Sequence, residues 1–406
     1  MTTKINNEHK KLNVPNSTDR GNVIRNVPHL RFPEFEGEWE DFLINDVCSE
    51  FKSGKNIKAD SISESGEYPV YGGNGLRGYT SSYNHEGLYV LIGRQGALCG
   101  NVRSVNGKTY ITEHAIAAAG NEKSNTSFLH YLFLKMNLGQ YSDQSAQPGL
   151  AVNKLLKLEV SLPPISEQKK IAKLLSLLDE RIATQNKIID KLQSLIKGLE
   201  DKILDNPLWE KTYLRSFMQF FSTNSLSWEQ LSYEEGEIRN LHYGLIHGFQ
   251  TRGINSASLP MIKNEAIPKQ YTLCQVGDVA FADASEDTGE IAKSVEFVDT
   301  IEGDTICGLH TIHGRDIKNR TVVGFKGFAF NSRYFHNQIK RLAQGTKIFS
   351  ITANNLSSCY VYLPDVETQK VIVKLLKAYE EQLIISRMTL KQYEKQKQYL
   401  LRQMFI

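Results

Sequence analysis

Two stretches of the chain carry apolar residues at alternating steps of four and three, which predicts two long coiled-coil helices. Helix starts are predicted near Ser166 and Glu367, just after a Leu-Pro pair that ends an extended segment. Such spacing keeps one face of a helix against a partner along its whole length, so each helix is expected to pair antiparallel with the other. The predicted seam consists of Ile171, Leu175, Leu178, Ile182, Gln185, Ile189, Leu192, Ile196 and Leu199 in the first helix, and of Ile372, Leu376, Tyr379, Leu383, Ser386, Leu390, Tyr393 and Leu400 in the second.

The two stretches are copies of one sequence. Residues 160–182 align with residues 361–383 at an offset of 201, with identity at ten of 23 positions. A repeat of this length indicates two similar halves, because solenoid units run to only about 20 to 50 residues. Gln168 and Gln369 occupy the same place in both copies, which favours a shared role at the helix start, either in capping or in docking a partner.

Each predicted helix follows a block in which short β-like runs alternate with Gly-rich turns. The predicted fold class is therefore α+β, with two mixed α/β domains separated by two long antiparallel coiled-coil helices in a pseudo-twofold internal repeat. Trp39-Glu40 and Trp228-Glu229 are interpreted as equivalent openings of the two domains. The predicted boundaries are 1–28 for a mobile N-terminal arm, 29–161 and 207–362 for the domains, and 162–206 and 363–406 for the helices.

Composition narrows the class of protein without naming a function. The chain has 40% hydrophobic residues, and no apolar run approaches the length that a membrane-spanning helix needs. The five cysteines include no CxxC pair, which argues against a disulfide framework and against a zinc site, so a reducing cytoplasm is expected.

Charge is distributed unevenly although the net charge is only +3. Residues 276–304 contain nine acidic side chains against one lysine, and residues 313–350 contain eight Lys or Arg against one aspartate. The basic run is interleaved with aromatic residues, as a surface that binds phosphates would be. A solvated face balanced by the acidic run explains the same pattern, and the sequence leaves both interpretations open.

Recognisable catalytic machinery is missing from the sequence. There is neither a phosphate-binding loop of the GxxxxGK[ST] type nor an Asn-Pro-Pro-aromatic motif for amino-methylation. His310 and His313 have HxxH spacing but lack accompanying ligands, so no metal site is predicted, and His114 is interpreted as a core imidazole. The chain is expected to bind or to scaffold rather than to catalyse.

Several segments resemble the specificity subunit of type I restriction-modification enzymes. They are residues 30–39 (LRFPEFEGEW), 68–75 (YPVYGGNG), 92–96 (IGRQG) and 111–115 (ITEHA), together with both Leu-Pro helix openings. The resemblance implies that each domain is a target-recognition domain contacting one half of a split DNA sequence, with the helices setting the unread gap. It implies double-stranded DNA, modification (methyltransferase) subunits and restriction (endonuclease and translocase) subunits as partners, and no membrane. It also implies that this chain binds no cofactor, because S-adenosylmethionine, ATP and Mg belong to the partner subunits, which perform adenine-N6 methylation and cleavage.

Candidate DNA contacts are polar loop residues, since Arg pairs well with guanine and Asn or Gln with adenine in the major groove. Lys52, Lys55 and Lys58 are predicted phosphate contacts. The candidate base readers are Asn74, Arg77, Tyr79, Arg94, Gln95, Gln144 and Gln147 in the first domain, and Arg239, His242, His247, Gln250, Arg252, Lys340, Arg341, Gln344 and Lys347 in the second.

Two other functions remain open at this point. A coiled-coil assembly protein with two domains that bind no DNA would show no salt-sensitive affinity for nucleic acid. A self-contained enzyme with an unrecognised nuclease or methyltransferase site would act without any partner chain.

Overall fold

The computed structural model describes residues 26–143, 148–249, 252–299, 301 and 303–406, so most of the predicted N-terminal arm lies outside the described residues. Contacts divide the chain into two units, one reaching to Arg181 and including Tyr393–Ile406, the other Ile182–Gln392. Both boundaries fall inside long helices, so each unit holds one mixed domain and a part of each helix. No helix among the described residues is long and apolar enough to cross a membrane.

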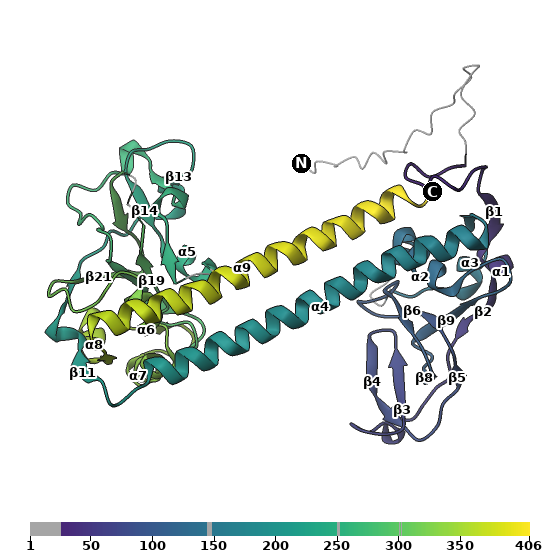
Figure 1. Ribbon diagram of the computed structural model, residues 1–406, viewed down its shortest axis with the longest axis horizontal. Coiled ribbons are helices and arrows are strands. Elements are labelled where there is room, and N and C mark those ends of the chain that lie inside the picture. Colours follow the sequence, from purple (N-terminus) through teal and green to yellow (C-terminus); the bar gives the residue numbers. More distant parts are fainter. Residues whose placement is uncertain (1–25, 144–147, 250–251, 300, 302) are drawn as a thin grey trace, which may run out of the picture. The chain divides into compact units, whose positions relative to one another are not determined.

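The domain of the first unit contains two four-stranded sheets, in the orders β2-β9-β6-β7 and β4-β3-β8-β5, and a strand pair β1-β10 (Figure 1). Helix α2 packs against β6, β7 and β9. The elements are β1 Glu40–Leu43, α1 Ile44–Val47, β2 Cys48–Ser53, η1 Ala59–Ser61, β3 Tyr68–Gly72, β4 Gly75–Thr80, β5 His85–Glu86, β6 Tyr89–Gly93, β7 Val102–Val105, β8 Lys108–Ile111, β9 Ala115–Gly120, α2 Thr126–Met136, η2 Leu138–Tyr141, α3 Val152–Leu155 and β10 Glu159–Leu162.

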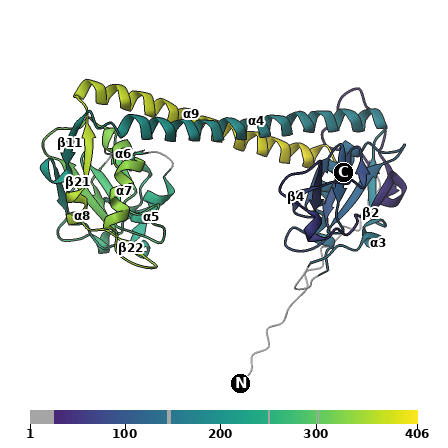
Figure 2. The same cartoon turned by 90° about the horizontal axis from the view of Figure 1, so that it is seen from below.

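The domain of the second unit contains a five-stranded sheet in the order β12-β21-β17-β19-β15, a four-stranded sheet in the order β13-β16-β14-β20, and the pairs β11-β23 and β18-β22 (Figure 2). Its elements are β11 Glu210–Tyr213, η3 Leu214–Ser216, β12 Met218–Phe221, η4 Trp228–Gln230, β13 Leu231–Ser232, β14 Arg239–Leu241, α5 Tyr243–Gly248, β15 Gly253–Ile254, η5 Ser256–Ser258, β16 Met261–Ile262, η6 Asn264–Ala266, β17 Val279–Ala282, β18 Ala284–Ser285, β19 Ser294–Phe297, β20 Thr305–Cys307, β21 Thr311–Asp316, α6 Phe325–Ala329, α7 Arg333–Leu342, β22 Phe349–Ser350, α8 Ala353–Ser358 and β23 Tyr360–Leu363.

The two domains share one plan although their sequences differ. Sheet β2-β9-β6-β7 corresponds to β12-β21-β17-β19, and β4-β3-β8 corresponds to β16-β14-β20. In both domains the second sheet contains a parallel strand pair, β3 with β8 and β14 with β20, in which Tyr71 lies opposite Ile111 and Leu241 opposite Cys307. The internal repeat seen in the helix sequences therefore extends through the domains, where strand order preserves it.

The proposed equivalence of Trp39 and Trp228 is wrong. Trp39 directly precedes β1, which pairs with β10, the strand before the first long helix. In the second domain the strand that pairs in this way is β11, and the residue directly before it is Trp209. Strand pairing, rather than the local Trp-Glu pattern, identifies Trp209 as the counterpart of Trp39.

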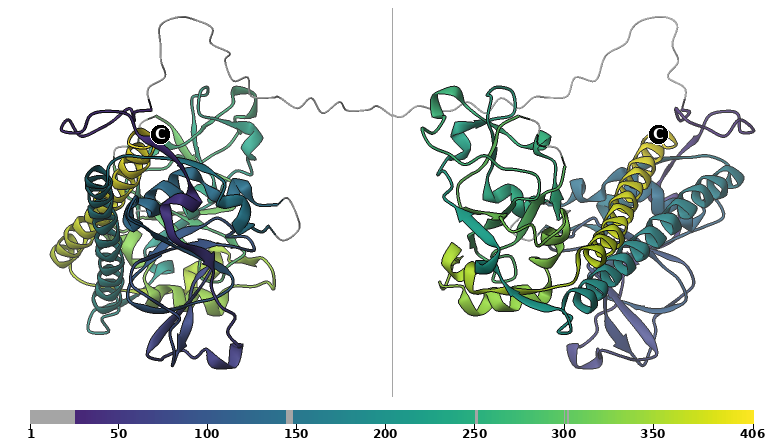
Figure 3. Two further views of the ribbon diagram at one scale, coloured as in Figure 1. Left: turned by 90° about the vertical axis from the view of Figure 1, so that its right-hand side faces the viewer. Right: turned by 60° about the vertical axis from the view of Figure 1, so that its left-hand side comes forward.

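The end of each long helix leads into a domain core. Leu204, the last residue of the first long helix, is buried in the second domain, with Trp209 packed against the same cluster. Phe405, just beyond the second long helix, stacks on Phe128 at 5.1 Å between ring centroids and meets Trp39 edge-on. Figure 3 shows this C-terminal end beside the first turns of α4. The residues after α9 therefore enter the core of the first domain, as the end of α4 enters the core of the second.

The long helices are α4 Ile165–Leu204, of 40 residues, and α9 Val366–Gln403, of 38 residues, each beginning one residue before its predicted start. All of the predicted seam positions are buried or half-buried. The helices run antiparallel within each unit: Asp179 and Lys397 form an ion pair in the first, and the Gln185 Nε2 atom donates to the Ser386 carbonyl at 3.1 Å in the second. The two polar seam positions, which are equivalent in the repeat, thus contact each other.

Gln168 and Gln369 hold the starts of the long helices against their domains. The Gln369 amide donates to the carbonyls of Pro364 and Arg320, and its oxygen accepts from the Val322 N–H at 2.9 Å. Gln168 repeats this pattern with the carbonyls of Pro163 and Lys123 and the N–H of Asn125. Both side chains are fully buried, so each satisfies three backbone groups that water cannot reach.

We expect Gln369→Ala to lower the free energy of unfolding by about 2–3 kcal/mol, because it leaves three buried backbone groups without partners. Urea unfolding followed by circular dichroism measures the effect. Gln392→Ala, at an exposed position of the same helix, is the matched control and should change stability by less than about 0.5 kcal/mol. Equal losses in the two variants would contradict the assigned role.

Candidate nucleic-acid interface

Four loops of the first domain meet at one edge of its sheets. They follow β2 and β6, and they connect β3 to β4 and β8 to β9, the last of which carries His114. The loop after β2 is fixed by the N–H of Gly54, which donates to the Ala115 carbonyl at 3.0 Å. The loop after β6 is fixed by the N–H of Arg94, which donates to the His114 carbonyl at 2.9 Å. The β3–β4 turn lies against the same place, since a Cβ on Gly73 would stand 2.5 Å from that carbonyl. Gly73 is therefore required by close backbone approach.

The side chains carried by these loops form a polar, exposed surface. Asn74 at the β3–β4 turn, Arg77 on β4 and Gln95 after β6 are all exposed. His114 Nδ1 lies 3.3 Å from Gln95 Oε1, and its side chain is 46% exposed. The interpretation of His114 as a core imidazole is wrong. Its position between two strands resembled a core position, but the chain turns outward there.

The other first-domain candidates are spread more widely. Lys55 lies at the same edge and its N–H donates to the Ile111 carbonyl, whereas Lys52 projects from β2 beside Glu50 at 3.2 Å. Lys58 is exposed just before η1, and Tyr79 is half-buried on β4. Gln144 and Gln147 lie outside the described residues.

The second domain has the same edge with different side chains. The Asp283 N–H donates to the His310 carbonyl at 3.0 Å, which repeats the bond between Arg94 and His114. His310 is half-exposed, contacts the Tyr243 ring edge-on at 5.2 Å, and has Nδ1 3.1 Å from Asp283 Oδ1. A histidine therefore opens the corresponding strand, β9 or β21, in each domain.

A hairpin from the basic run lies beside this second edge. Strand β22 pairs with β18, and the backbones of Gln344 and Ser350 bond to each other in both directions. Gln344 and Lys347 are exposed on this hairpin. The adjoining cavity of about 510 Å³ is lined by Tyr243, His247, Ala284, Ser285, Glu286, Asp287, Glu290, His310 and Ile348. Of the predicted set, His247 lines this cavity, and Gln344 and Lys347 lie on the hairpin that contributes Ile348 to it.

Two of the predicted base readers have structural roles instead. The Arg239 guanidinium donates to the carbonyls of Ala257 and Leu259 at 3.0 and 3.1 Å. His242 is only 3% exposed, accepts from the Gly244 N–H at the start of α5 and packs on the Trp228 ring. Burial, with a smaller effect from His310, lowers the pKa of His242, so it is a neutral acceptor at pH 7. The prediction that His242 reads a base is wrong because its ring faces the interior.

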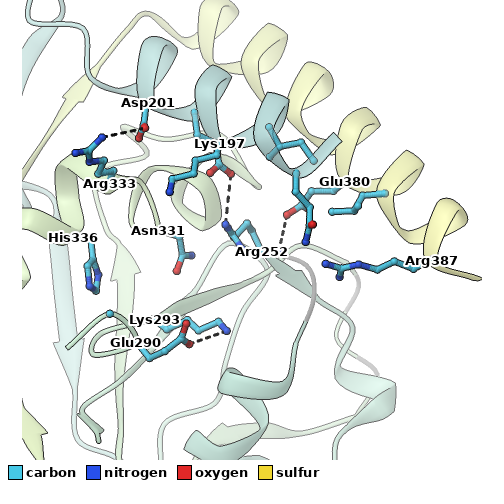
Figure 4. A pocket seen from close by; sticks show the side chains of 15 residues that line it. Lys197, Asp201, Arg252, Glu290, Lys293, Asn331, Arg333, His336, Glu380 and Arg387 are labelled. Carbon is cyan, nitrogen blue, oxygen red and sulfur yellow. Dashed lines mark hydrogen bonds and ion pairs between the residues drawn. The ribbon is translucent and has the colours of Figure 1, made fainter. Parts of the chain in front are cut away.

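Arg252 lies between the second domain and the parts of α4 and α9 in the same unit (Figure 4). Its Nη2 is 3.7 Å from Glu200 Oε1, and its backbone N–H donates to Glu380 Oε1 at 3.3 Å. These residues line a cavity of about 460 Å³. Lys340 and Arg341 are exposed in the last turn of α7, and Gln250 lies outside the described residues.

Known proteins of one family resemble this chain. The family model described as "Type I restriction modification DNA specificity domain" matches residues 36–194 and 318–394, more than half of the chain. The chain belongs to this family. The resemblance noted in the sequence is therefore confirmed.

Individual members of the type I specificity family match different lengths. The EcoprrI specificity subunit of Escherichia coli is 42% identical over 154 residues, which cover 37% of this chain and 38% of the relative. This match therefore spans well under half of that relative. The MjaVIII specificity subunit of Methanocaldococcus jannaschii is 24% identical over 400 residues, 91% of each chain. The S subunit structure from M. genitalium has a TM-score of 0.62 at 16% identity, covering 94% of this chain and 99% of that one, and so shares the fold.

Two members of the basic run pair with two members of the acidic run inside the second domain of this specificity-family chain. Lys326 Nζ lies 2.9 Å from Glu296 Oε1, and both side chains are buried. Arg315 donates to both carboxylate oxygens of Asp278, at 2.8 and 2.7 Å. Although burial raises it, the bonds from Arg315 and His313 hold the pKa of Asp278 below its usual value. Part of the basic run is therefore structural, and Lys340, Arg341 and Lys347 remain exposed at the surface.

Glu380 gives stability a pH dependence. Burial raises its pKa to about 7, against the lowering effect of Arg252, with Glu200 and Lys377 also acting on it. The folded chain keeps this proton up to about pH 7, whereas the unfolded chain releases it near 4.5, so stability falls as pH rises between these values.

We expect Glu380→Gln to raise the free energy of unfolding at pH 8 by about 2–3 kcal/mol and to flatten this dependence. Urea unfolding from pH 4.5 to 8 measures it; an undiminished slope in the variant, or the same flattening in the exposed control Glu381→Gln, would contradict it.

We expect His114→Ala and His310→Ala each to weaken binding of the target duplex by about 5- to 100-fold, as for loss of a base contact. Fluorescence anisotropy at fixed salt measures the affinity. His29→Ala, which removes an exposed histidine away from both edges, is the control and should bind like the unchanged chain. Unaltered affinity in both edge variants would exclude these edges from the interface.

Proposed function

We propose that the chain is the DNA-binding specificity subunit of a type I restriction-modification complex. Its two domains bind double-stranded DNA, each contacting one half of a bipartite target. The observation that carries this proposal is the duplicated edge: two domains of one strand order, in a chain of the DNA specificity family, each present exposed polar loops around an equivalent histidine.

The affinity would come mainly from phosphates and the specificity from base edges. Exposed lysines near these loops, such as Lys55 and Lys347, are suited to phosphate contacts, while Asn74, Gln95 and Gln344 can hydrogen-bond to bases. The uninterrupted helices α4 and α9 would fix the unread gap, because a continuous helix changes length only by insertion or deletion of residues.

Catalysis is proposed to reside in partner chains. Modification subunits would bind S-adenosylmethionine and methylate adenine N6, and restriction subunits would use ATP and Mg to translocate and cleave DNA. Support comes from the relatives, which are named specificity subunits, and from apolar side chains exposed on α9, including Val371, Ile385 and Met388, which suit a protein partner. A cytoplasmic location is proposed on the same basis.

The alternative of an assembly protein that binds no DNA receives no support from the comparisons.

The test is to co-express the chain with its cognate modification subunit in cells whose DNA lacks N6-methyladenine, and to map methylation across the genome. One split motif with a fixed gap is the expected result, since two linked domains read two separated segments. The control is the chain expressed alone, which should give no methylation. A continuous motif would contradict the two-domain reading, and methylation by the chain alone would contradict catalysis by a partner.

A further inference from the structure

The second domain contains a buried cluster of metal-ligating side chains that DNA recognition does not use. Cys274, Cys307 and His313 each offer a ligand atom within 4.8 Å of the other two, and all three residues are buried. The two Sγ atoms are 3.6 Å apart. Two thiolates on one tetrahedral zinc ion, with Zn–S bonds of about 2.3 Å, lie about 3.8 Å apart, so this separation already suits an ion.

The backbone holds the three residues in place from different elements. Cys307 ends β20, which pairs with β14, and His313 lies in β21 between β12 and β17. Cys274 precedes β17, and its N–H donates to the Thr305 carbonyl at 2.8 Å. The cluster therefore joins the two sheets of the second domain. Because the ligands come from separate segments, the two cysteines have no CxxC spacing, and the other histidine of the HxxH spacing, His310, contacts Asp283 instead.

A carboxylate supports the histidine of this cluster. His313 Nε2 lies 2.7 Å from Asp278 Oδ2, and both side chains are buried. Metal-bound histidines usually donate their other ring nitrogen to a carboxylate, which fixes the ring and its tautomer. Asp278 is itself held by Arg315 and by the Gln275 N–H, so the arrangement is rigid before any ion binds.

The fold does not require these side chains. Strand register makes Ile111 the first-domain equivalent of Cys307, and Ala117 the equivalent of His313. Both are fully buried and apolar. The same architecture is therefore stable with apolar side chains at these positions. Packing alone does not explain why the second domain has Cys307 and His313 there.

We propose that Cys274, Cys307 and His313 bind a structural zinc ion that ties together the two sheets of the second domain. Two thiolates and a neutral imidazole form a common ligand set for zinc, and Asp278 is beside them to complete the coordination or to orient the ring.

The experiment measures zinc in the full-length purified chain by elemental analysis, after removal of metal and addition of zinc under reducing conditions. About one zinc per chain is expected. Cys274→Ser and Cys307→Ser should lose it. Cys359→Ser is the matched control, because that residue is also buried but belongs to a different core cluster of the unit, and it should keep zinc.

A second measurement does not depend on whether the serine variants fold. Cobalt(II) added to the metal-free unchanged chain should produce thiolate-to-metal charge-transfer absorption, which zinc then abolishes. Failure of the reduced chain to bind either ion, equal zinc in the Cys274→Ser and Cys359→Ser chains, or a disulfide between Cys274 and Cys307 in the freshly purified protein would each overturn the proposal. These readouts need no DNA, so they stand apart from the test of DNA recognition.

Discussion

The structure depends on burial of the apolar seam along the two long helices. A helix of 40 residues with an apolar stripe cannot stand alone in water, and in this chain the stripe of α4 is covered by α9 within each unit. This constraint brings the C-terminus of the chain to its first domain. Phe405 then packs against Trp39 in the core of the first domain, so the last residues of the chain complete the core near its first described residues.

The starts of the long helices are attached to the domains by hydrogen bonds as well as by apolar contacts. Gln168 and Gln369 each satisfy three buried backbone groups at the point where a strand turns into a helix. Polar attachment of this kind fixes orientation, because hydrogen bonds are directional where apolar contacts are not. For a chain of the DNA specificity family, the orientation of the exposed loops bears on the proposed function, and Gln168 and Gln369 help to fix the helix starts in each half.

The two domains share one arrangement of strands but differ in their loop residues and in their buried side chains. Their strand orders agree, and a histidine opens the same strand in each, but the neighbouring loop begins with Arg94 in one and Asp283 in the other. The interiors also differ: the first domain has isoleucine and alanine where the second has Cys307 and His313. Loops and buried polar groups can vary in this way because the sheets supply the backbone pairing independently of side chains.

The sequence by itself determined the long helices, their seam, the internal repeat and the family. Helix periodicity and a repeated motif lie within contiguous segments of the chain, so they can be recognised without knowing the fold. The sequence also indicated Asn74, Arg94 and Gln95 as candidate base readers, from two separate Gly-rich segments. Only the tertiary structure decided that His114 is exposed and His242 buried, and that Trp209 rather than Trp228 matches Trp39. It also decided that Arg315 and Lys326 of the basic run pair with Asp278 and Glu296 of the acidic run. It likewise brought Cys274, Cys307 and His313 together. Each of these depends on which strands pair across long separations in sequence, and the period-two pattern of a short strand does not specify its partner.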